Sequence, residues 1–298
     1  MTSLPTNPDD VAELGNLDFI ARQLVEGMMM GRHRSPYKGS SVEFVEHRQY
    51  HPGDEIRHID WRAFGKTGRY YVKEYEDETN LRAYILLDAS GSMKYAGASL
   101  AKFDYARIIA ATLSWLLLSQ RDSVGLMTFD SQIRQQLKPS ASRSAFQEIL
   151  RVLDATAPAA ETSLAETLTS ILPGIKQRSL LVLISDCLDS IDLLEAALQQ
   201  CRHARHEIVI FRVAAPEEVE FPFRSPTQFR DFERAGHQQL VDPARLRNEY
   251  LQQYAEFTKR LDRICGNLAI DYVSLQTSDS LQEGLGNWLD RRMRLSGR

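Results

Sequence analysis

Residues 88–92 combine one carboxylate with two hydroxyl groups at alternate positions, in the order Asp88, Ser90 and Ser92. Oxygen atoms of this kind are the ligands that Mg²⁺ prefers, and Mn²⁺ or Ca²⁺ can use similar sets. Gly91 allows the chain to bend tightly between the two serines. A structural alternative is that Ser90 or Ser92 caps a following helix. The pattern favours a cation site, because an apolar run typical of a buried strand leads directly into it.

Two later segments carry oxygen ligands of the same type. Thr162 precedes an expected helix, and Asp186 directly follows the apolar run 179–185. In an open α/β sheet the loops after parallel strands meet at one edge, so we expect these residues to approach Asp88. Two carboxylates about 4 Å apart repel by roughly 4 kcal/mol at an effective dielectric of about 20. A divalent ion between Asp88 and Asp186 would remove that repulsion, and hydroxyl ligands would leave it electrophilic enough to accept a partner's carboxylate.

From residue 82 onwards, short apolar segments alternate with segments of helical spacing. This order predicts strands joined by helical crossovers, and therefore a mainly parallel sheet with helices on both faces. Residues 133–137 follow the expected strand 123–129 after only a short turn, so they must pair antiparallel. We therefore predict an α/β fold with a doubly wound, mainly parallel six-stranded sheet and one antiparallel edge strand. The expected strands are 82–88, 123–129, 133–137, 179–185, 207–213 and 269–276, and the expected helices are 102–119, 142–153, 164–172, 191–201, 243–265 and 280–294.

The sequence predicts two parts with a boundary between residues 81 and 82. Residues 1–81 contain a helical apolar pattern at 17–30, followed by segments of strand-like composition, so we expect a helix and a small β-rich appendage. Residues 82–298 form the expected sheet domain. Within it, 216–241 interrupts the alternation with phenylalanines among prolines and charges, and we expect a hairpin excursion there.

The composition is that of a globular protein and argues against several classes of function. Of 298 residues, 43% are hydrophobic and 26% are charged, and the formal net charge is −4. This balance gives no global basic surface for nucleic acid, although a loop with Arg32, Arg34 and Lys38 offers a local one. Three widely spaced cysteines indicate reduced thiols. The N-terminus lacks an apolar signal core and the longest near-apolar run, 108–118, is too short for a bilayer, so we expect a cytoplasmic protein without a membrane span.

The three motifs together resemble the metal-ion-dependent adhesion site of von Willebrand factor A-type domains, and the resemblance covers residues 82–298. It implies that Ser90, Ser92 and Thr162 are direct ligands of Mg²⁺, with Asp88 and Asp186 close by. The sequence departs from the family pattern at two positions. Ala160 stands where a glycine usually precedes the threonine motif, with the acidic Glu161 next to it, and Cys187 stands where a glycine often follows the last aspartate. A vestigial site without metal therefore stays open as an alternative.

Two N-terminal segments extend the resemblance to nearly the whole chain. Residues 50–61 contain Tyr50, Gly53, Asp54, Arg57, Ile59, Asp60 and Trp61, and residues 72–76 read Val-Lys-Glu-Tyr-Glu. This spacing resembles the bacterial family catalogued as domain of unknown function 58, in which the signature precedes an A-type domain. Members of that family typically accompany MoxR-type AAA+ ATPases, and many are anchored in the membrane. The resemblance therefore implies an adaptor or co-chaperone that joins such an ATPase to a client protein.

The residues leave two main hypotheses about function. The first is a non-catalytic, metal-dependent protein-binding module that captures an Asp or Glu of a partner. The second is a metal-assisted hydrolase or phosphatase that uses Asp88 as base or nucleophile, with Lys94 and Lys102 as candidate phosphate ligands. The sequence shows no evident Cys–His or Ser–His pairing and no phosphate-binding glycine-rich loop. We therefore favour the binding module over the enzyme.

Overall fold

The computed structural model describes residues 16–30, 47–50, 61–73, 81–142, 144–159, 161, 163–230, 232 and 238–296. The chain divides into two compact units. The larger unit comprises residues 1–32 and 81–298, and the smaller unit comprises residues 33–80.

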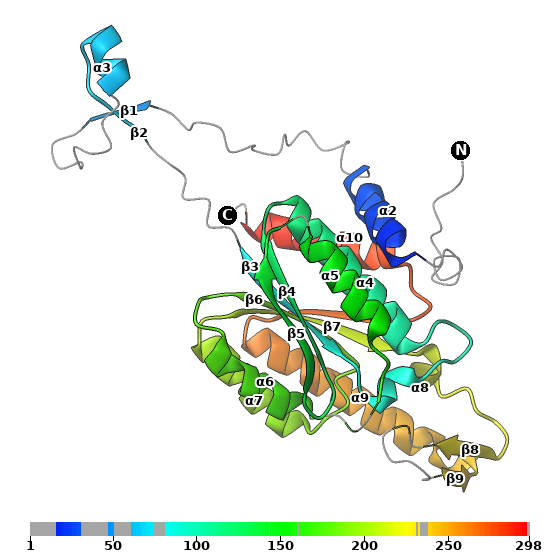
Figure 1. The fold of residues 1–298 in the computed structure, drawn as a ribbon. Coiled ribbons are helices and arrows are strands. Elements are labelled where there is room, and N and C mark those ends of the chain that lie inside the picture. Colours follow the sequence, from blue (N-terminus) through cyan, green and yellow to red (C-terminus); the bar gives the residue numbers. More distant parts are fainter. Residues whose placement is uncertain are drawn as a thin grey trace. The chain divides into compact units, whose positions relative to one another are not determined.

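A six-stranded sheet forms the centre of the larger unit (Figure 1). Its strands are β3 (Arg82–Asp88), β4 (Ser123–Phe129), β5 (Ile133–Ser140), β6 (Leu180–Ser185), β7 (Glu207–Ala214) and β10 (Asp271–Gln276). They lie in the order β10-β7-β6-β3-β4-β5, and all neighbours pair in parallel except β4 and β5. The predicted sheet is thereby confirmed, including its antiparallel edge strand, because the short turn after Phe129 leaves no room for a crossover.

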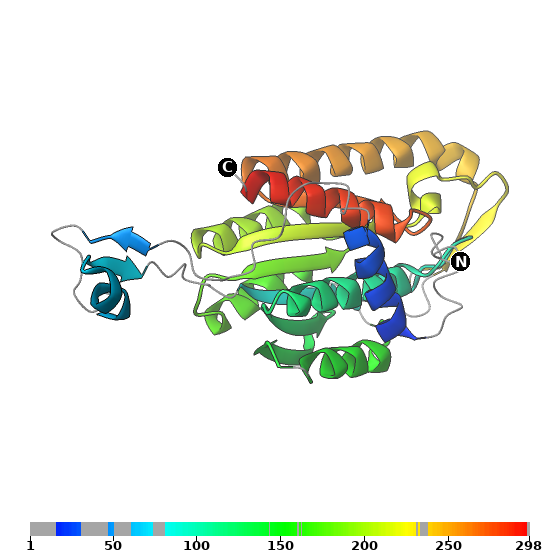
Figure 2. The same ribbon diagram turned by 90° about the horizontal axis from the view of Figure 1, so that it is seen from above.

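Helices cover both faces of this sheet (Figures 1 and 2). One face packs against α2 (Leu17–Met30), α4 (Lys102–Ser119), α5 (Ala145–Ala155) and α10 (Leu281–Ser296), and the other against α6 (Leu164–Ile171), α7 (Ile191–His203) and α9 (Pro243–Asn267). Strand β3 supplies both cores, because successive side chains of a strand point to opposite faces. Ile85 and Leu87 join the first core, whereas Tyr84 and Leu86 join the second. This double burial explains why the strand reads as an uninterrupted apolar run.

Helix α2 corrects the domain boundary that we expected from the sequence. It belongs to the larger unit, whereas we expected it to lie with the appendage. Its apolar side chains, among them Ile20 and Leu24, are buried in the same core as those of α4 and α10. The guanidinium of Arg22 also lies 3.7 Å from the ring centroid of Trp115 on α4. An amphipathic helix needs an apolar surface to cover, and the sheet domain provides it.

The smaller unit contains a two-stranded antiparallel ladder and one helix. Strand β1 (His47–Gln49) pairs with β2 (Tyr71–Lys73), and α3 (Trp61–Thr67) lies between them in the chain. The ring of Tyr70 stacks on Phe64 with a centroid distance of 4.4 Å, and Trp61 contacts both rings edge-on. The helix was not expected in this region. Most of the signature segment, residues 51–60, lies outside the described residues, as do Arg32, Arg34 and Lys38.

The interruption after β7 contains the expected hairpin and a short helix that was not expected. The helix is α8 (Pro216–Glu220), and β8 (Thr227–Arg230) pairs antiparallel with β9 (Gln238–Val241). Phe221 anchors this segment, because its ring lies 4.5 Å from that of Tyr250 on α9 and 5.2 Å from that of Phe223. Two 3₁₀ turns, η2 (Gly91–Lys94) and η3 (Leu172–Gly174), complete the larger unit. Among the described residues, no helix combines the length and the apolar character needed to cross a bilayer.

Candidate metal and partner-binding site

The candidate site lies at the carboxyl edge of the two central strands. Asp88 is the last residue of β3, and Asp186 directly follows the last residue of β6. The two strands are parallel neighbours in which Leu87 pairs with Ile184, so both carboxylates emerge at the same edge. The sequence prediction that Asp88 and Asp186 approach each other is consistent with this arrangement. It places the candidate site where ligands bind in open α/β sheets.

Asp88 is fully buried and both of its oxygens have partners. Its Oδ1 accepts a hydrogen bond from the backbone N–H of Ser90 at 2.9 Å, and its Oδ2 accepts one from the hydroxyl of Ser185 at 2.6 Å. Burial, together with the nearby charge of Asp186, raises the pKa of Asp88 to about 7. Asp88, which is 0% exposed, therefore holds the turn after β3 in place through its bond to the backbone of Ser90.

The two serine hydroxyls of the turn lie next to each other. Ser90 Oγ is 3.1 Å from Ser92 Oγ, and the hydroxyl of Ser92 is near enough to Asp186 to help lower the pKa of that carboxyl. Ser90 precedes η2, but its side chain makes no capping bond to that turn. The helix that follows, α4, has Ala101 at its N-cap position. The alternative that these serines serve as helix caps is therefore not supported, and their hydroxyls lie between the carboxyl groups of Asp88 and Asp186.

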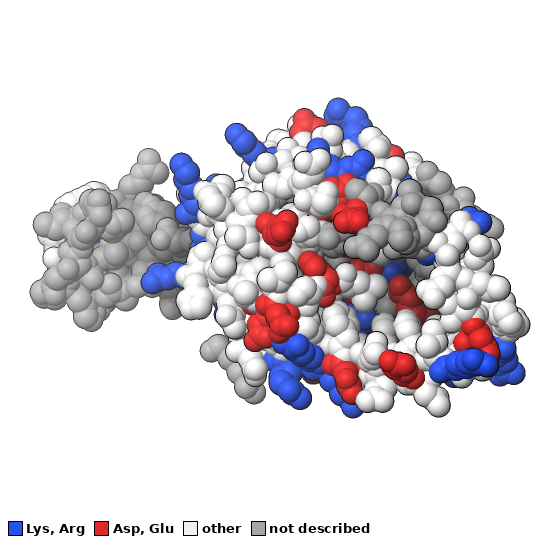
Figure 3. Space-filling model, turned by 90° about the horizontal axis from the view of Figure 1, so that it is seen from below, with Lys and Arg blue, Asp and Glu red and all other residues white. Residues whose placement is uncertain are grey.

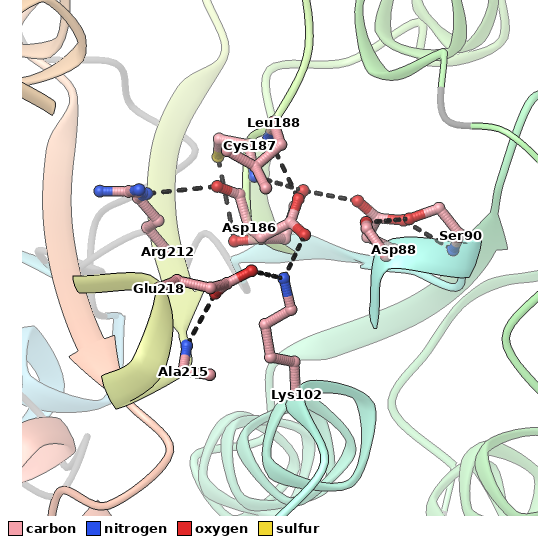
Figure 4. A network of polar contacts seen from close by, with 11 residues as sticks. Asp88, Ser90, Lys102, Asp186, Cys187, Leu188, Arg212, Ala215 and Glu218 are labelled. Atoms are coloured by element: carbon pink, nitrogen blue, oxygen red, sulfur yellow. Dashed lines mark hydrogen bonds and ion pairs between the residues drawn. The ribbon is translucent and has the colours of Figure 1, made fainter. Parts of the chain in front are cut away.

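Asp186 is held by a buried cation. Its Oδ2 lies 2.7 Å from Lys102 Nζ, and its Oδ1 accepts a hydrogen bond from the backbone N–H of Leu188 at 3.1 Å. Burial alone would raise the pKa of Asp186, but the charge and hydrogen bond of Lys102 outweigh it and hold the pKa below its ordinary value. The backbone carbonyl of Asp186 accepts a bond from Arg212 Nε at 3.2 Å (Figure 4).

Cys187 occupies the position where the family pattern often has glycine. Its φ is 59°, in the left-handed region that favours glycine because other residues clash there. Its backbone N–H donates to the hydroxyl of Ser185 at 2.9 Å, and its side chain is buried in the second core. The departure in sequence therefore leaves the left-handed turn after Asp186 in place.

Thr162, the third predicted ligand, lies outside the described residues, as does Ala160. The residues on either side of this gap reach the same edge of the sheet. Ala159 N–H donates to the carbonyl of Ala89 at 2.8 Å, and Ser163 N–H donates to the carbonyl of Asp130 at 3.4 Å. Ala89 directly follows Asp88, so the chain before the gap is bonded next to the candidate site.

Two features of the site, the role of Lys102 and the presence of Glu218, were not predicted from the sequence. Lys102 was considered only as a candidate phosphate ligand, but its side chain is 1% exposed and lies between two carboxylates (Figure 4). Its Nζ is 2.6 Å from Glu218 Oε1 on α8. A signal was available, since a lysine as the first residue of a helix opposes the helix dipole and needs another explanation. No comparable signal pointed to Glu218, which lies on α8 in the segment that interrupts the alternation of strands and helices after β7.

The donor set fits a hard divalent cation. In the described part of the chain, no group of three or more His, Cys, Asp or Glu residues is arranged to hold a metal, so an ion here depends on hydroxyl ligands. The hydroxyls of Ser90 and Ser92 supply such ligands, and the buried carboxylates of Asp88 and Asp186 supply negative charge beside them. Burial, and after it the charge of Asp186, raises the pKa of Asp88, so a cation bound beside this carboxyl would favour its ionised form. Ser90 and Ser92 would hold the ion, with Asp88 and Asp186 adjacent.

Comparison with known proteins places the chain in a family. The model of the family described as "Protein of unknown function DUF58" matches residues 46–260, which is more than half of the chain. The uncharacterized protein Mb1516 of Mycobacterium bovis is 25% identical over 276 residues, which cover 91% of this chain and 86% of that protein. The uncharacterized protein Rv1480 of Mycobacterium tuberculosis is similar to the same extent.

Solved structures are similar at lower identity. The conserved hypothetical protein BatB from Bacteroides thetaiotaomicron is 17% identical, with a TM-score of 0.49 over 72% of this chain and 99% of that one. The VWA domain of SpRpn10 is 14% identical, with a TM-score of 0.43 over 71% of this chain and 95% of that one. The mainly parallel sheet with its antiparallel edge, and the Asp-x-Ser-x-Ser turn at the end of β3, carry the fold assignment. The chain therefore belongs to the DUF58 family, and its larger unit has a von Willebrand factor A-like fold.

Proposed function

We propose that the larger unit is a non-catalytic protein-binding module that captures an acidic side chain of a partner at its carboxyl edge. Ser90, Ser92 and Thr162 would hold a divalent cation, Mg²⁺ in the first instance, with Asp88 and Asp186 beside it. The observation that carries this proposal is the pair of serine hydroxyls, 3.1 Å apart, next to two buried carboxylates. A bound ion would supply an electrophilic centre whose free coordination position a partner's carboxylate can fill.

The same contacts argue against a hydrolase. A nucleophile or general base must reach the substrate, but Asp88 is 0% exposed and both of its oxygens accept hydrogen bonds within the protein. Lys102 is committed to Asp186 and Glu218, so it is not free to bind a phosphate. The binding module therefore explains the buried groups better than the enzyme does.

The surroundings of the site suit a protein partner. Leu188, whose backbone N–H bonds Asp186, exposes 43% of its surface, and Leu193 at the start of α7 exposes 58%. A partner with an acidic residue next to an apolar side chain would match an ion with Leu188 beside it. Acidic and basic side chains intermingle on the face shown in Figure 3, which offers no extended basic field there for nucleic acid.

The first partner to test is a MoxR-type AAA+ ATPase, as the family resemblance suggests, with the chain acting as adaptor between the ATPase and a client. The full chain, immobilised, would be exposed to the purified ATPase with Mg²⁺ and again with a chelator. We expect retention in Mg²⁺ that is lost on chelation and lost in the Ser90→Ala/Ser92→Ala variant. Ser131→Ala is the matched control, because Ser131 is an exposed serine in the turn after β4. Retention that survives both chelation and the double substitution would contradict capture through an ion.

A further inference from the structure

Among the ion pairs of the described residues, Lys102 and Asp186 stand out by their burial. Their side chains are 1% and 2% exposed, and the Nζ–Oδ2 distance is 2.7 Å. A second carboxylate, that of Glu218, lies 2.6 Å from the same Nζ and is 19% exposed (Figure 4). A single ammonium group therefore joins the candidate cation site at the end of β6 to the short helix α8.

Neither helix formation nor core packing accounts for Lys102. It is the first residue of α4, where the unpaired N–H groups of the helix disfavour a positive charge. Removing an ammonium group from water is also unfavourable unless acidic partners compensate. An apolar side chain at this position would avoid both penalties, so the charge itself needs an explanation.

Asp186 is the group that Lys102 and a divalent ion would share. Its Oδ2 bonds Lys102, and Ser92, a proposed ligand of the ion, has its hydroxyl near enough to the same carboxylate to affect its pKa. Two cations at one carboxylate repel each other, and burial strengthens this repulsion. Lys102 therefore opposes an ion that approaches Asp186 from the serine side.

Glu218 gives the ammonium a second, well-anchored partner. Its Oε2 accepts a hydrogen bond from Ala215 N–H at 2.8 Å, and its backbone carbonyl accepts one from the hydroxyl of Tyr250 at 2.8 Å. Lys102 would consequently keep one carboxylate when Asp186 turns toward an ion. Asp186 can therefore either bond Lys102 or turn toward an ion, and in both cases Lys102 keeps an acidic partner.

We propose that Lys102 is an internal counter-cation of this site, which holds Asp186 in place when no ion is bound and weakens divalent-ion binding by competing for Asp186. This inference rests on the proposed function, because it concerns the same site. It makes retention of the ion depend on a further ligand, and the carboxylate of a partner supplies one. Ion and partner then bind more tightly together than either does alone.

The test measures Mn²⁺ affinity by calorimetry on the full chain after chelation and desalting. Lys102→Met removes the competing charge, and we expect Mn²⁺ to bind at least about tenfold more tightly than to the wild type, because the repulsion between the cations is gone. Lys94→Met is the matched control, because Lys94 is an exposed lysine of the neighbouring turn η2, and its affinity should stay close to that of the wild type. A lysine with a purely structural role would give the opposite result, since damage to the site lowers affinity.

A second measurement follows thermal unfolding of the same proteins. In chelator, the melting temperature of Lys102→Met should be lower than that of the wild type. Saturating Mn²⁺ should reduce this difference in melting temperature. Glu218→Gln serves as an independent variant in case Lys102→Met does not fold. It leaves Asp186 as the only charged partner of Lys102, so Mn²⁺ should bind more weakly than to the wild type.

The outcomes separate this inference from the proposed function. If Lys102→Met binds Mn²⁺ no more tightly than the wild type, or if Glu218→Gln binds it as tightly as the wild type, the proposed role of Lys102 is wrong. Measurable Mn²⁺ affinity of the wild type would then still support the ion-dependent function. Binding by Lys102→Met but not by the wild type alone supports the inference, and the proposed function is then decided by whether the wild type retains its partner in Mg²⁺ and loses it on chelation. Absence of binding in the wild type and in a folded Lys102→Met variant overturns both.

Discussion

The two ends of the central sheet handle charge in different ways. At the carboxyl edge, Asp88, Asp186 and Lys102 are each 2% exposed or less. At the opposite edge, where the parallel strands begin and which we call the amino edge, Glu207 at the start of β7 pairs with Arg178 at 2.6 Å and Arg292 at 2.9 Å. The side chain of Glu207 is 36% exposed. The same parallel strands therefore end in buried charges on one side and begin in half-exposed ion pairs on the other.

This difference indicates which edge is under functional constraint. Half-exposed pairs such as Glu207–Arg292 retain much of their hydration and require little compensation. Buried charges lose that hydration, and apolar side chains of similar volume are often at least as stabilising. The amino edge shows that this fold can order its strand ends without buried ions. The buried charges of the carboxyl edge therefore serve something other than folding, which supports the proposal that the site acts there.

The largest expected effect compares one carboxylate from each edge. Asp186→Ala should lower the free energy of unfolding by about 2–3 kcal/mol, because it removes one of the two acidic partners of the buried Lys102 and leaves the N–H of Leu188 without its acceptor. Glu207→Ala should cost about 1 kcal/mol or less, because its arginine partners are partly exposed and can be solvated. Urea unfolding in the presence of chelator measures both values. Equal losses at the two edges would remove the contrast on which the functional argument depends.

A second contrast concerns pH. The pKa of Asp88 is raised to about 7 by burial and by Asp186, so between about pH 4 and about pH 7 the unfolded chain is ionised at this position while the native chain holds a proton. The free energy of unfolding should therefore fall as pH rises through this window in chelator. The contribution of Asp88 reaches up to about 4 kcal/mol if the whole shift is expressed.

Asp88→Asn provides the comparison, because the amide retains an oxygen acceptor and cannot ionise. We expect this variant to lose less stability than the wild type between about pH 4 and about pH 7. Chemical denaturation across that pH range measures the difference. Parallel curves for the two proteins would show that Asp88 does not titrate as its environment indicates.

The sheet could be predicted from the sequence because local patterns determine it. The predicted bounds of β3, α4 and β4 coincide with the observed ones, since long apolar runs end at clear polar residues. Of the candidate ligands, Asp88, Ser90, Ser92 and Asp186 converge because the carboxyl ends of β3 and β6 are neighbours. The alternation of elements predicts that these strand ends share one edge of the sheet, whereas the direct adjacency of β3 and β6, which are not consecutive in the chain, comes from the tertiary fold.

The missed features depend on contacts between distant parts of the chain. Lys102 and Glu218 are 116 residues apart, and nothing in either local sequence indicates that they meet. The place of α2 in the larger unit depends on the surface offered by α4 and α10, which the sequence of Leu17–Met30 does not reveal. Patterns within one segment predict which face of that segment is buried, whereas the identity of the covering surface comes from the tertiary fold.

A third contrast compares exposed apolar side chains at the two edges. Leu188 is 43% exposed beside Asp186, and Met293 is 48% exposed on α10 next to Arg292 of the amino edge. Leu188→Ser should weaken retention of the ATPase by more than about 1 kcal/mol, the size typical of a contact near the centre of an interface. Met293→Ser should leave retention unchanged. Mn²⁺ affinity, measured in parallel, should not change in either variant, and a loss of retention with Met293→Ser instead would place the interface at the amino edge.

The smallest expected effect lies at the amino edge, where the stability should depend on pH with the opposite sign to that of Asp88. His206 is buried, its Nδ1 accepts a hydrogen bond from Ser179 N–H at 3.2 Å, and burial lowers its pKa. The unfolded chain therefore takes up a proton below the ordinary pKa of histidine while the native chain does not, so acidification through that range should reduce stability.

His206→Asn keeps an acceptor for the N–H of Ser179 and cannot take up that proton. We expect the wild type to lose about 1 kcal/mol or less relative to this variant over the first pH unit below the ordinary pKa of histidine. The comparison requires both proteins in chelator, so that ion binding at the other edge does not contribute. Asp88 makes the free energy of unfolding fall as the pH rises, and His206 makes it rise. When the two edges titrate independently, the double variant Asp88→Asn/His206→Asn should therefore show a flatter dependence of stability on pH than either single variant.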